Sequence, residues 1–141
     1  MTLTPASSRT SAGGDAQLAY AEITGNVSVT ATSAATAVTV VSSGAVTYDG
    51  TRVCIEFSAE DVLVGPTANS YVLVALWDDA TDLGRLAQFN VANTEQPCYV
   101  RRFLTPSAAV HTYIIKAWRQ VSNGTIIAGA GVVDTVFPAF C

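Results

Sequence analysis

The fold is decided by residues 111–133, which read HTYIIKAWRQVSNGTIIAGAGVV. Between His111 and Val121 the side chains alternate in character, so the odd-numbered residues from 113 to 117 share one face of an extended chain. The even-numbered residues from 114 to 118 share the other face. Asn123-Gly124 is the strongest signal for a tight hairpin turn in the chain, and residues 125–133 would form the returning strand. This stretch therefore predicts two paired β-strands.

Strand-like segments continue on both sides of this stretch, and turn signals recur roughly every 8–12 residues. The segments cover residues 18–23, 26–32, 36–41, 46–48, 52–57, 70–77, 83–91, 98–104 and 136–141. Segment 70–77 is almost wholly apolar, as expected of a central strand that is buried on both faces. No segment has the 3.6-residue period of a helix. The pattern predicts an all-β, antiparallel sandwich.

Among double-sheet folds, the number of strands favours a jelly roll, which has about eight main strands. An immunoglobulin-like sandwich is the alternative. It would have fewer strands and a Cys…Trp…Cys spacing that this sequence lacks.

Composition agrees with one β-rich domain. The chain has 141 residues, half of them hydrophobic and only 13% charged, and Val and Thr suit a pleated surface. The net charge of −4 excludes nucleic acid as an expected partner, because phosphate binding needs clustered Lys and Arg. Arg101-Arg102 is the only tight basic pair, and a strand would split it between two faces. Mean hydropathy is +0.36, yet no apolar run approaches the ~20 residues of a membrane helix. We therefore expect apolar surface to be covered by copies of the same chain.

Residues 1–17 predict a flexible N-terminal arm, with the sandwich domain occupying residues 18–141. Thr, Ser, Ala, Gly and Pro dominate this stretch, which cannot bury enough apolar area to fold alone. The chain start has neither a basic region nor an apolar core, so it does not indicate a secretory signal. Such an arm is either without consequence or orders on a neighbouring subunit. In the second case Leu3, Pro5 and Arg9 are the residues expected to bind.

A search for chemistry finds no catalytic, cofactor-binding or metal-binding set. His111 is the only histidine, so a Ser-His-Asp set would have to use it, and no G-x-S-x-G elbow is present. We interpret His111 as a residue at the start of a strand after a loop. Asp78, Asp79 and Asp82 form an acidic stretch that could attract Ca²⁺, but its spacing lacks the EF-hand pattern. A solvated hairpin tip is the preferred interpretation.

The cysteines and tryptophans also have structural interpretations. Cys54, Cys98 and Cys141 are widely spaced, and we expect free, buried thiols, with Cys141 as a possible exposed one. Trp77 and Trp118 lie in apolar strands, which indicates a core or subunit-interface position. No cofactor is expected.

The sequence also resembles a class of phage virion jelly-roll domains. The residues that carry the likeness are Leu18-Ala19-Tyr20-Ala21-Glu22-Ile23-Thr24, Asn26 to Thr32, Tyr99 to Ala108 followed by His111-Thr112-Tyr113, Ala128-Gly129-Ala130-Gly131 and Phe137-Pro138-Ala139-Phe140. The middle run is similar to an L-T-P-S-A-G-x-H-T-Y segment, with Ala109 at the Gly position. Such domains occur as capsid decoration proteins, head fibres and tail tips of actinobacteriophages. They are similar to trimers of the tumour-necrosis-factor and complement type.

The resemblance implies a homotrimer on the surface of a virion, most simply on the head, and supplies no catalytic residues. The first hypothesis is a capsid decoration protein that braces the major capsid protein. The alternative is a tail or baseplate module that recognises a host glycan or protein, for which Tyr48 is the candidate exposed aromatic residue. An enzyme is a distant third. Tyr113 and Trp118 are the residues expected at the trimer interface.

Overall fold

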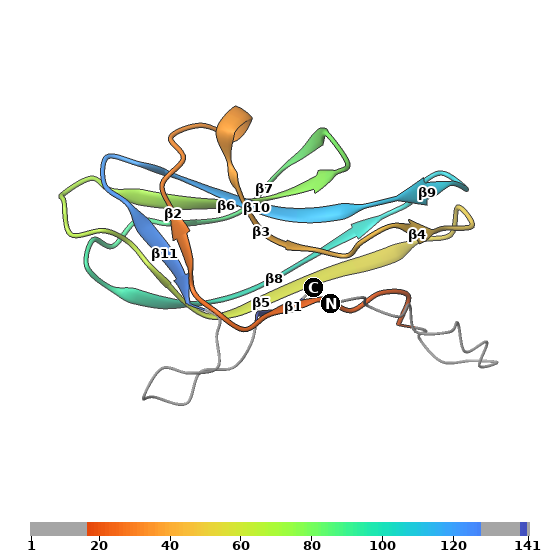
Figure 1. Cartoon of the computed structure of the whole chain (residues 1–141), viewed down its shortest axis with the longest axis horizontal. Helices are drawn as coiled ribbons and strands as arrows, with labels where there is room; N and C mark the ends of the chain where they lie inside the picture. Colours follow the sequence, from red (N-terminus) through yellow and green to blue (C-terminus); the bar gives the residue numbers. More distant parts are fainter. Residues whose placement is uncertain (1–16, 128–138, 141) are drawn as a thin grey trace.

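The chain folds into two facing layers of β-strands (Figure 1). The computed structural model describes residues 17–127 and 139–140. Within them the only helical element is one turn of 3-10 helix, η1 (Ala34–Thr36), and no helix is long and apolar enough to cross a membrane. The predicted all-β sandwich is confirmed. The predicted arm, with Leu3, Pro5 and Arg9, lies outside the described residues.

Eight main strands make the two sheets. The first sheet has the order β8 (Glu95–Leu104), β5 (Val53–Leu63), β11 (Gly124–Ile127) and β2 (Val27–Val29). The second has the order β7 (Thr81–Phe89), β6 (Tyr71–Asp78), β10 (Tyr113–Gln120) and β3 (Val38–Ser42). Four two-residue strands complete the structure: β1 (Glu22–Ile23), β4 (Val46–Thr47), β9 (Val110–His111) and β12 (Ala139–Phe140).

The connectivity is that of a jelly roll. Among the eight main strands in chain order, the first pairs with the last, β2 with β11, and the second with the seventh, β3 with β10. The third pairs with the sixth, β5 with β8, and the two middle strands, β6 and β7, form a hairpin. All these pairs are antiparallel. Nested pairing of this kind rolls one long antiparallel ribbon into two sheets, so the architecture predicted from the sequence is confirmed.

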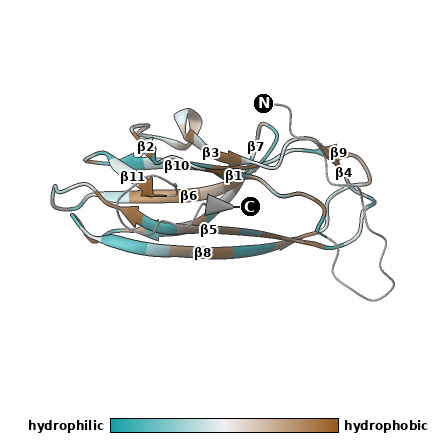
Figure 2. Cartoon of the chain, turned by 60° about the horizontal axis from the view of Figure 1, so that its bottom comes forward, coloured by the Kyte–Doolittle hydropathy of each residue, from teal (hydrophilic) through white to brown (hydrophobic). Residues whose placement is uncertain are grey.

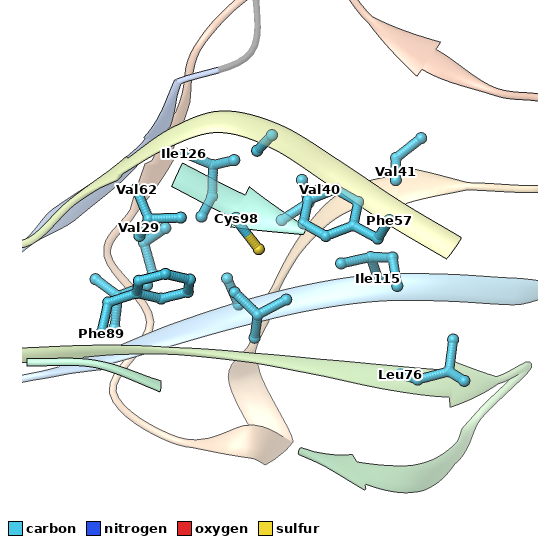
Figure 3. Packing of buried hydrophobic residues seen from close by; sticks show 14 of the residues in the cluster. Val29, Val40, Val41, Phe57, Val62, Leu76, Phe89, Cys98, Ile115 and Ile126 are labelled. Carbon is cyan, nitrogen blue, oxygen red and sulfur yellow. The ribbon is translucent and has the colours of Figure 1, made fainter. Parts of the chain in front are cut away.

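The core fills the space between the sheets. Phe57 and Ile126 of the first sheet and Leu76 and Ile115 of the second are 0% exposed, and Phe57 and Ile115 both project into this space (Figure 3). In β10 the residues at 113, 115 and 117 are buried and those at 114, 116 and 118 are only partly buried. The faces predicted from the alternation are therefore the observed ones.

Strand β6 is buried on both faces, as its apolar sequence predicted. Leu73, Ala75 and Trp77 point away from the core, yet they are only 4%, 0% and 5% exposed. The Trp77 ring meets the Trp118 ring edge to face, with 6.0 Å between centroids. The Lys116 ammonium lies 5.0 Å from the centre of the Trp77 ring. Side chains of β6 and β10 therefore shield each other on the outer surface of the second sheet.

The predicted hairpin at Asn123-Gly124 is wrong. The chain turns there, but β10 belongs to the second sheet and β11 to the first, so the two strands do not pair. The left-handed backbone lies at Val121, with φ of 75°, rather than at Gly124. Glycine is required at 124 for space, since a Cβ there would lie 2.3 Å from Val72 Cγ2. Asn123-Gly124 thus lies where the chain passes from the second sheet to the first, close to Val72.

Adjacent isoleucines of β10 give a matched test of this packing. We expect Ile115→Ala to lower the free energy of unfolding by about 2–5 kcal/mol, because it removes a fully buried side chain and leaves a cavity. Ile114→Ala, on the partly exposed outer face, should cost about 1 kcal/mol or less. Urea unfolding of both variants measures the difference. Equal losses at the two positions would contradict the assignment of faces.

Candidate functional site

The outward surface of the β5–β8 pair is the most unusual surface in the described chain. The register places Cys54 opposite Phe103, Glu56 opposite Arg101 and Ser58 opposite Tyr99. Residues directly opposite one another in an antiparallel pair point to the same side. Hydrophilic and hydrophobic stretches follow one another along both strands (Figure 2). We call this surface the outer β5–β8 face and define it by the exposed residues Arg52, Cys54, Glu56, Tyr99, Arg101 and Phe103.

Two large aromatic rings on this face are open to solvent. Tyr99 is 61% exposed and Phe103 is 51% exposed. The guanidinium carbon of Arg52 lies 4.3 Å from the centre of the Phe103 ring, and that of Arg101 lies 5.9 Å away. Cations over an aromatic face are attracted by its quadrupole. The face therefore presents an aromatic ring already flanked by two positive charges.

At the other end of the face, Tyr99 is oriented by an acidic neighbour. Its hydroxyl donates a 3.2 Å hydrogen bond to Oε1 of Glu56. The negative charge of Glu56 raises the pKa of the Tyr99 hydroxyl, and the hydrogen bond adds to this effect. The phenol therefore remains neutral and able to donate at physiological pH. The face combines a polar end at Tyr99 with a cationic end at Phe103.

The adjacent arginines are separated, as the strand assignment predicted. Arg101 is exposed on the outer β5–β8 face, whereas Arg102 points to the other side of β8 and is partly buried. Arg102 donates a 2.6 Å hydrogen bond from its guanidinium to the carbonyl oxygen of Leu83 in β7. Arg102 thus links β8 of the first sheet to β7 of the second, whereas Arg101 remains exposed on the outer β5–β8 face. The sequence showed this split but did not identify the aromatic face beside it.

The residues predicted at a subunit interface lie in different environments. Tyr113 is 1% exposed and belongs to the core, so it has no surface to offer a second copy. Burial, together with the nearby Asp78 carboxylate, raises the pKa of its hydroxyl to about 12. Trp118 is partly exposed on the outer surface of the second sheet, against Trp77. Of the two, only Trp118 offers side-chain area for contact.

Tyr48 is also placed differently from the sequence prediction. It was expected as an exposed aromatic residue near a loop tip, but it is only 5% exposed. Its ring meets the rings of His111 and Tyr113 edge to face, with centroids 5.8 and 5.5 Å away. These two rings cover that of Tyr48, and the turn that follows at Gly50 lies against the loop after β8. The exposed aromatic residues lie on a strand face instead.

A second cluster surrounds the single histidine, which was predicted to begin a strand after a loop and is the second residue of the two-residue strand β9 that follows the loop. Nδ1 of His111 lies 2.7 Å from Oδ2 of Asp78, and Nε2 lies 3.0 Å from Oγ of Ser107. These side chains come from β9, the end of β6 and the loop after β8. Sequence spacing could not reveal this grouping, because 33 residues separate His111 from Asp78. The order of atoms matches the Ser-His-Asp arrangement of hydrolases.

The surroundings of the imidazole favour a structural role for this cluster. The ring is stacked on Tyr113, with 6.0 Å between centroids and 6° between planes, and Tyr48 covers its edge. Nε2 also lies 3.2 Å from the main-chain oxygen of Ser107, which holds the ring against the loop as well as against the hydroxyl. We interpret the cluster as a lock that fixes the loop after β8 to the β6–β7 hairpin.

The acidic stretch forms a hairpin tip, as preferred from the sequence. Asp78 pairs with Thr81 across the β6–β7 turn, and Asp79 occupies the left-handed region with φ of 51°. Oδ1 of Asp82 accepts a hydrogen bond from the amide of Gly84. Within residues 17–127 and 139–140, no group of three His, Cys, Asp or Glu residues could hold a metal ion.

The thiols agree only in part with the prediction of buried cysteines. Cys98 is buried at 2% exposure, but Cys54 is exposed on the outer β5–β8 face. Burial raises the pKa of the Cys98 thiol to about 12, so its reactive thiolate form is rare at physiological pH. Cys141 lies outside the described residues.

This difference predicts the reactivity of the thiols. At pH 8, and at a dilution at which the folded chain is monomeric, we expect a thiol reagent to modify Cys54 quickly and Cys98 only after unfolding, because, of these two thiols, only Cys54 is accessible. The measurement uses a Cys141→Ser variant as background and Cys54→Ser in that background as control. Rapid modification of Cys98 in the folded control would contradict the assignment.

The histidine lock predicts a loss of stability. His111→Ala should lower the free energy of unfolding by about 1–3 kcal/mol, because it leaves Oδ2 of Asp78 without its partner and uncovers Tyr48. Ser107→Ala, at an exposed position, should cost less than about 1 kcal/mol. Denaturant unfolding compares the two variants, and a larger loss at Ser107 would contradict this ranking.

Comparison with known proteins leaves the site to be interpreted from its own geometry. No protein-family model matches the chain, and no curated protein matches it. The outer β5–β8 face offers exposed rings and guanidinium groups on a rigid pair of strands. The histidine cluster offers a hydrogen-bonded array that is packed into the fold.

Proposed function

We propose that the protein is a non-enzymatic structural subunit of a phage particle, which binds the outside of the capsid as a homotrimer and braces the major capsid protein. The observation that carries this proposal is the outer β5–β8 face. Tyr and Arg are typical of residues that dominate protein–protein binding energy, and here they are exposed on a sandwich whose core is already filled. Such a surface is better suited to a protein partner than to solvent.

The motif resemblance adds a second line of support. Its middle run corresponds to the end of β8, the loop after it and β9. In this run Ser107 and His111 belong to the histidine lock, and Tyr113 packs against it. The motif residues thus have structural roles. Such roles are consistent with a family that is defined by its fold and assembly rather than by catalysis. The predicted arm, with Leu3, Pro5 and Arg9, would add contacts to a neighbouring subunit at an ordering cost.

The alternative is a receptor-binding module of a tail or baseplate. The exposed Tyr99 and Phe103 rings favour it to the extent that sugars stack on aromatic faces. However, both rings lie on a flat strand face, and Phe103 is already flanked by Arg52 and Arg101. Tyr48, the expected loop-tip residue, is buried. The arrangement is therefore better suited to a broad protein contact than to a small concave sugar site.

Copy number in the particle tests the proposal. Quantitative mass spectrometry of purified virions should find this chain at a ratio to the major capsid protein that approaches stoichiometric, because decoration trimers would repeat over the whole shell. A ratio of a few per cent or less would favour the tail module instead. Absence from virions would contradict both.

A further inference from the structure

The outer β5–β8 face is a positive region on an acidic molecule. It holds two of the seven basic residues of the chain, Arg52 and Arg101, against one acidic residue, Glu56, whereas the whole chain has a net charge of −4. The guanidinium groups converge on one exposed ring, Phe103. A partner for this face should therefore supply negative charge beside an apolar contact.

Symmetry limits how a second copy could meet this face. A two-fold dimer whose axis passes through this face would place Arg52 and Arg101 close to their own copies, which costs electrostatic energy. In a cyclic trimer each contact joins two different surfaces. A positive face on an acidic chain is suited to this second arrangement, because the opposing surface is free to be negative.

The β6–β7 hairpin tip provides a negative surface. Asp79 and Asp82 are both exposed at this tip, and Asp78 at its base is engaged with His111. Oδ1 of Asp82 accepts a hydrogen bond from the amide of Gly84, and this bond fixes the direction of the carboxylate. The tip therefore presents two exposed carboxylates on a tight turn, and that of Asp82 is oriented.

The β6–β7 hairpin and the β5–β8 pair belong to the two facing layers, and the end of β6 lies on the same side of the molecule as the beginning of β5 (Figure 1). Asp78 joins the hairpin to His111 of β9 at 2.7 Å. The turn before β5 approaches the loop after β8, since a Cβ on Gly50 would lie 3.8 Å from Ala108. The two surfaces nevertheless belong to different sheets. In a ring of copies around one axis, the β5–β8 face of one copy can therefore meet the hairpin tip of the next.

We propose that the outer β5–β8 face of each copy binds the β6–β7 hairpin tip of the next copy, in a closed ring of three. Arg52 and Arg101 pair with Asp79 and Asp82 of the neighbour, around the Phe103 ring. This inference rests on the homotrimer of the proposed function and names the surfaces that form it. Cys54, opposite Phe103, becomes covered when the ring closes.

Charge reversal on the full chain tests the pairing. Light scattering after size exclusion should find the wild type as a trimer, and Arg52→Glu with Arg101→Glu should raise the dissociation constant at least about 100-fold. Arg85→Glu is the matched control, because Arg85 is exposed on β7 outside the face; it should leave the trimer intact. A double variant that stays trimeric, or a wild type that is dimeric or monomeric, would overturn the proposal.

Changes to the hairpin make the test reciprocal. Asp79→Asn with Asp82→Asn should weaken the trimer, since Asn removes the charge while it tolerates the left-handed backbone and keeps an acceptor for Gly84. Glu95→Lys, an exposed acid at the far end of β8, is the control. Asp79→Lys and Asp82→Lys, added to the two Arg→Glu changes, should restore the trimer at least about tenfold. Absence of this rescue in a folded chain would also overturn the pairing.

One measurement needs no charge variant. The Cys54 thiol, in the Cys141→Ser background, should react at least about tenfold more slowly in the trimer than after dilution to monomer or in roughly 0.5 M salt, which screens exposed charges. Equal rates would overturn the proposal. Failure of this proposal and of the proposed function are separable, since a trimer held by other surfaces could still reach near-stoichiometric copy number in virions.

Discussion

The structure depends on the burial of one face of β10 between the two sheets. Residues 113, 115 and 117 of this strand enter the core, and its backbone pairs with β3 on one side and with β6 on the other. A shift of the register by one residue would expose this entire set. The same alternation sends Lys116 and Trp118 outward, where they shield β6. The alternation of side chains along β10 thus defines both the core and an outer surface.

Local sequence patterns predicted most of this arrangement because strand alternation and turn chemistry are local properties. The apolar segment 70–77 became the doubly buried β6, and the Asp78-Asp79 signal became a true hairpin. Asn123-Gly124 was misinterpreted because a turn signal does not state which sheet receives the next strand. The space beside Val72, which only glycine fits at 124, is set by a strand about fifty residues earlier and is invisible to a local pattern.

The candidate sites were predicted less well, for a related reason. Alternation gives the faces of a strand but does not tell which face another layer will cover. Tyr113 and Tyr48 were both assigned to surfaces, and both are in the core. Tyr99 and Phe103 alternate in the same way and remain exposed, because none of the strands within residues 17–127 and 139–140 packs over that side of β8. The cluster of Ser107, His111 and Asp78 draws on three separate elements and forms only when the ribbon rolls up.

The pairing of β5 with β8 also makes the outer face suitable for binding. β5 pairs with β8 along most of its length, and its other side pairs with β12 at Ser58 and with β11 from Asp61 to Leu63, so little backbone freedom remains to be lost in a complex. Arg102 ties the free edge of β8 to Leu83, and contacts with Phe103 and Glu56 already orient Arg52 and Tyr99. Ordering an interfacial side chain typically costs about 0.5–1.5 kcal/mol. A face whose rings and cations are oriented beforehand avoids part of that cost, and the interactions that build the sandwich thereby prepare its binding surface.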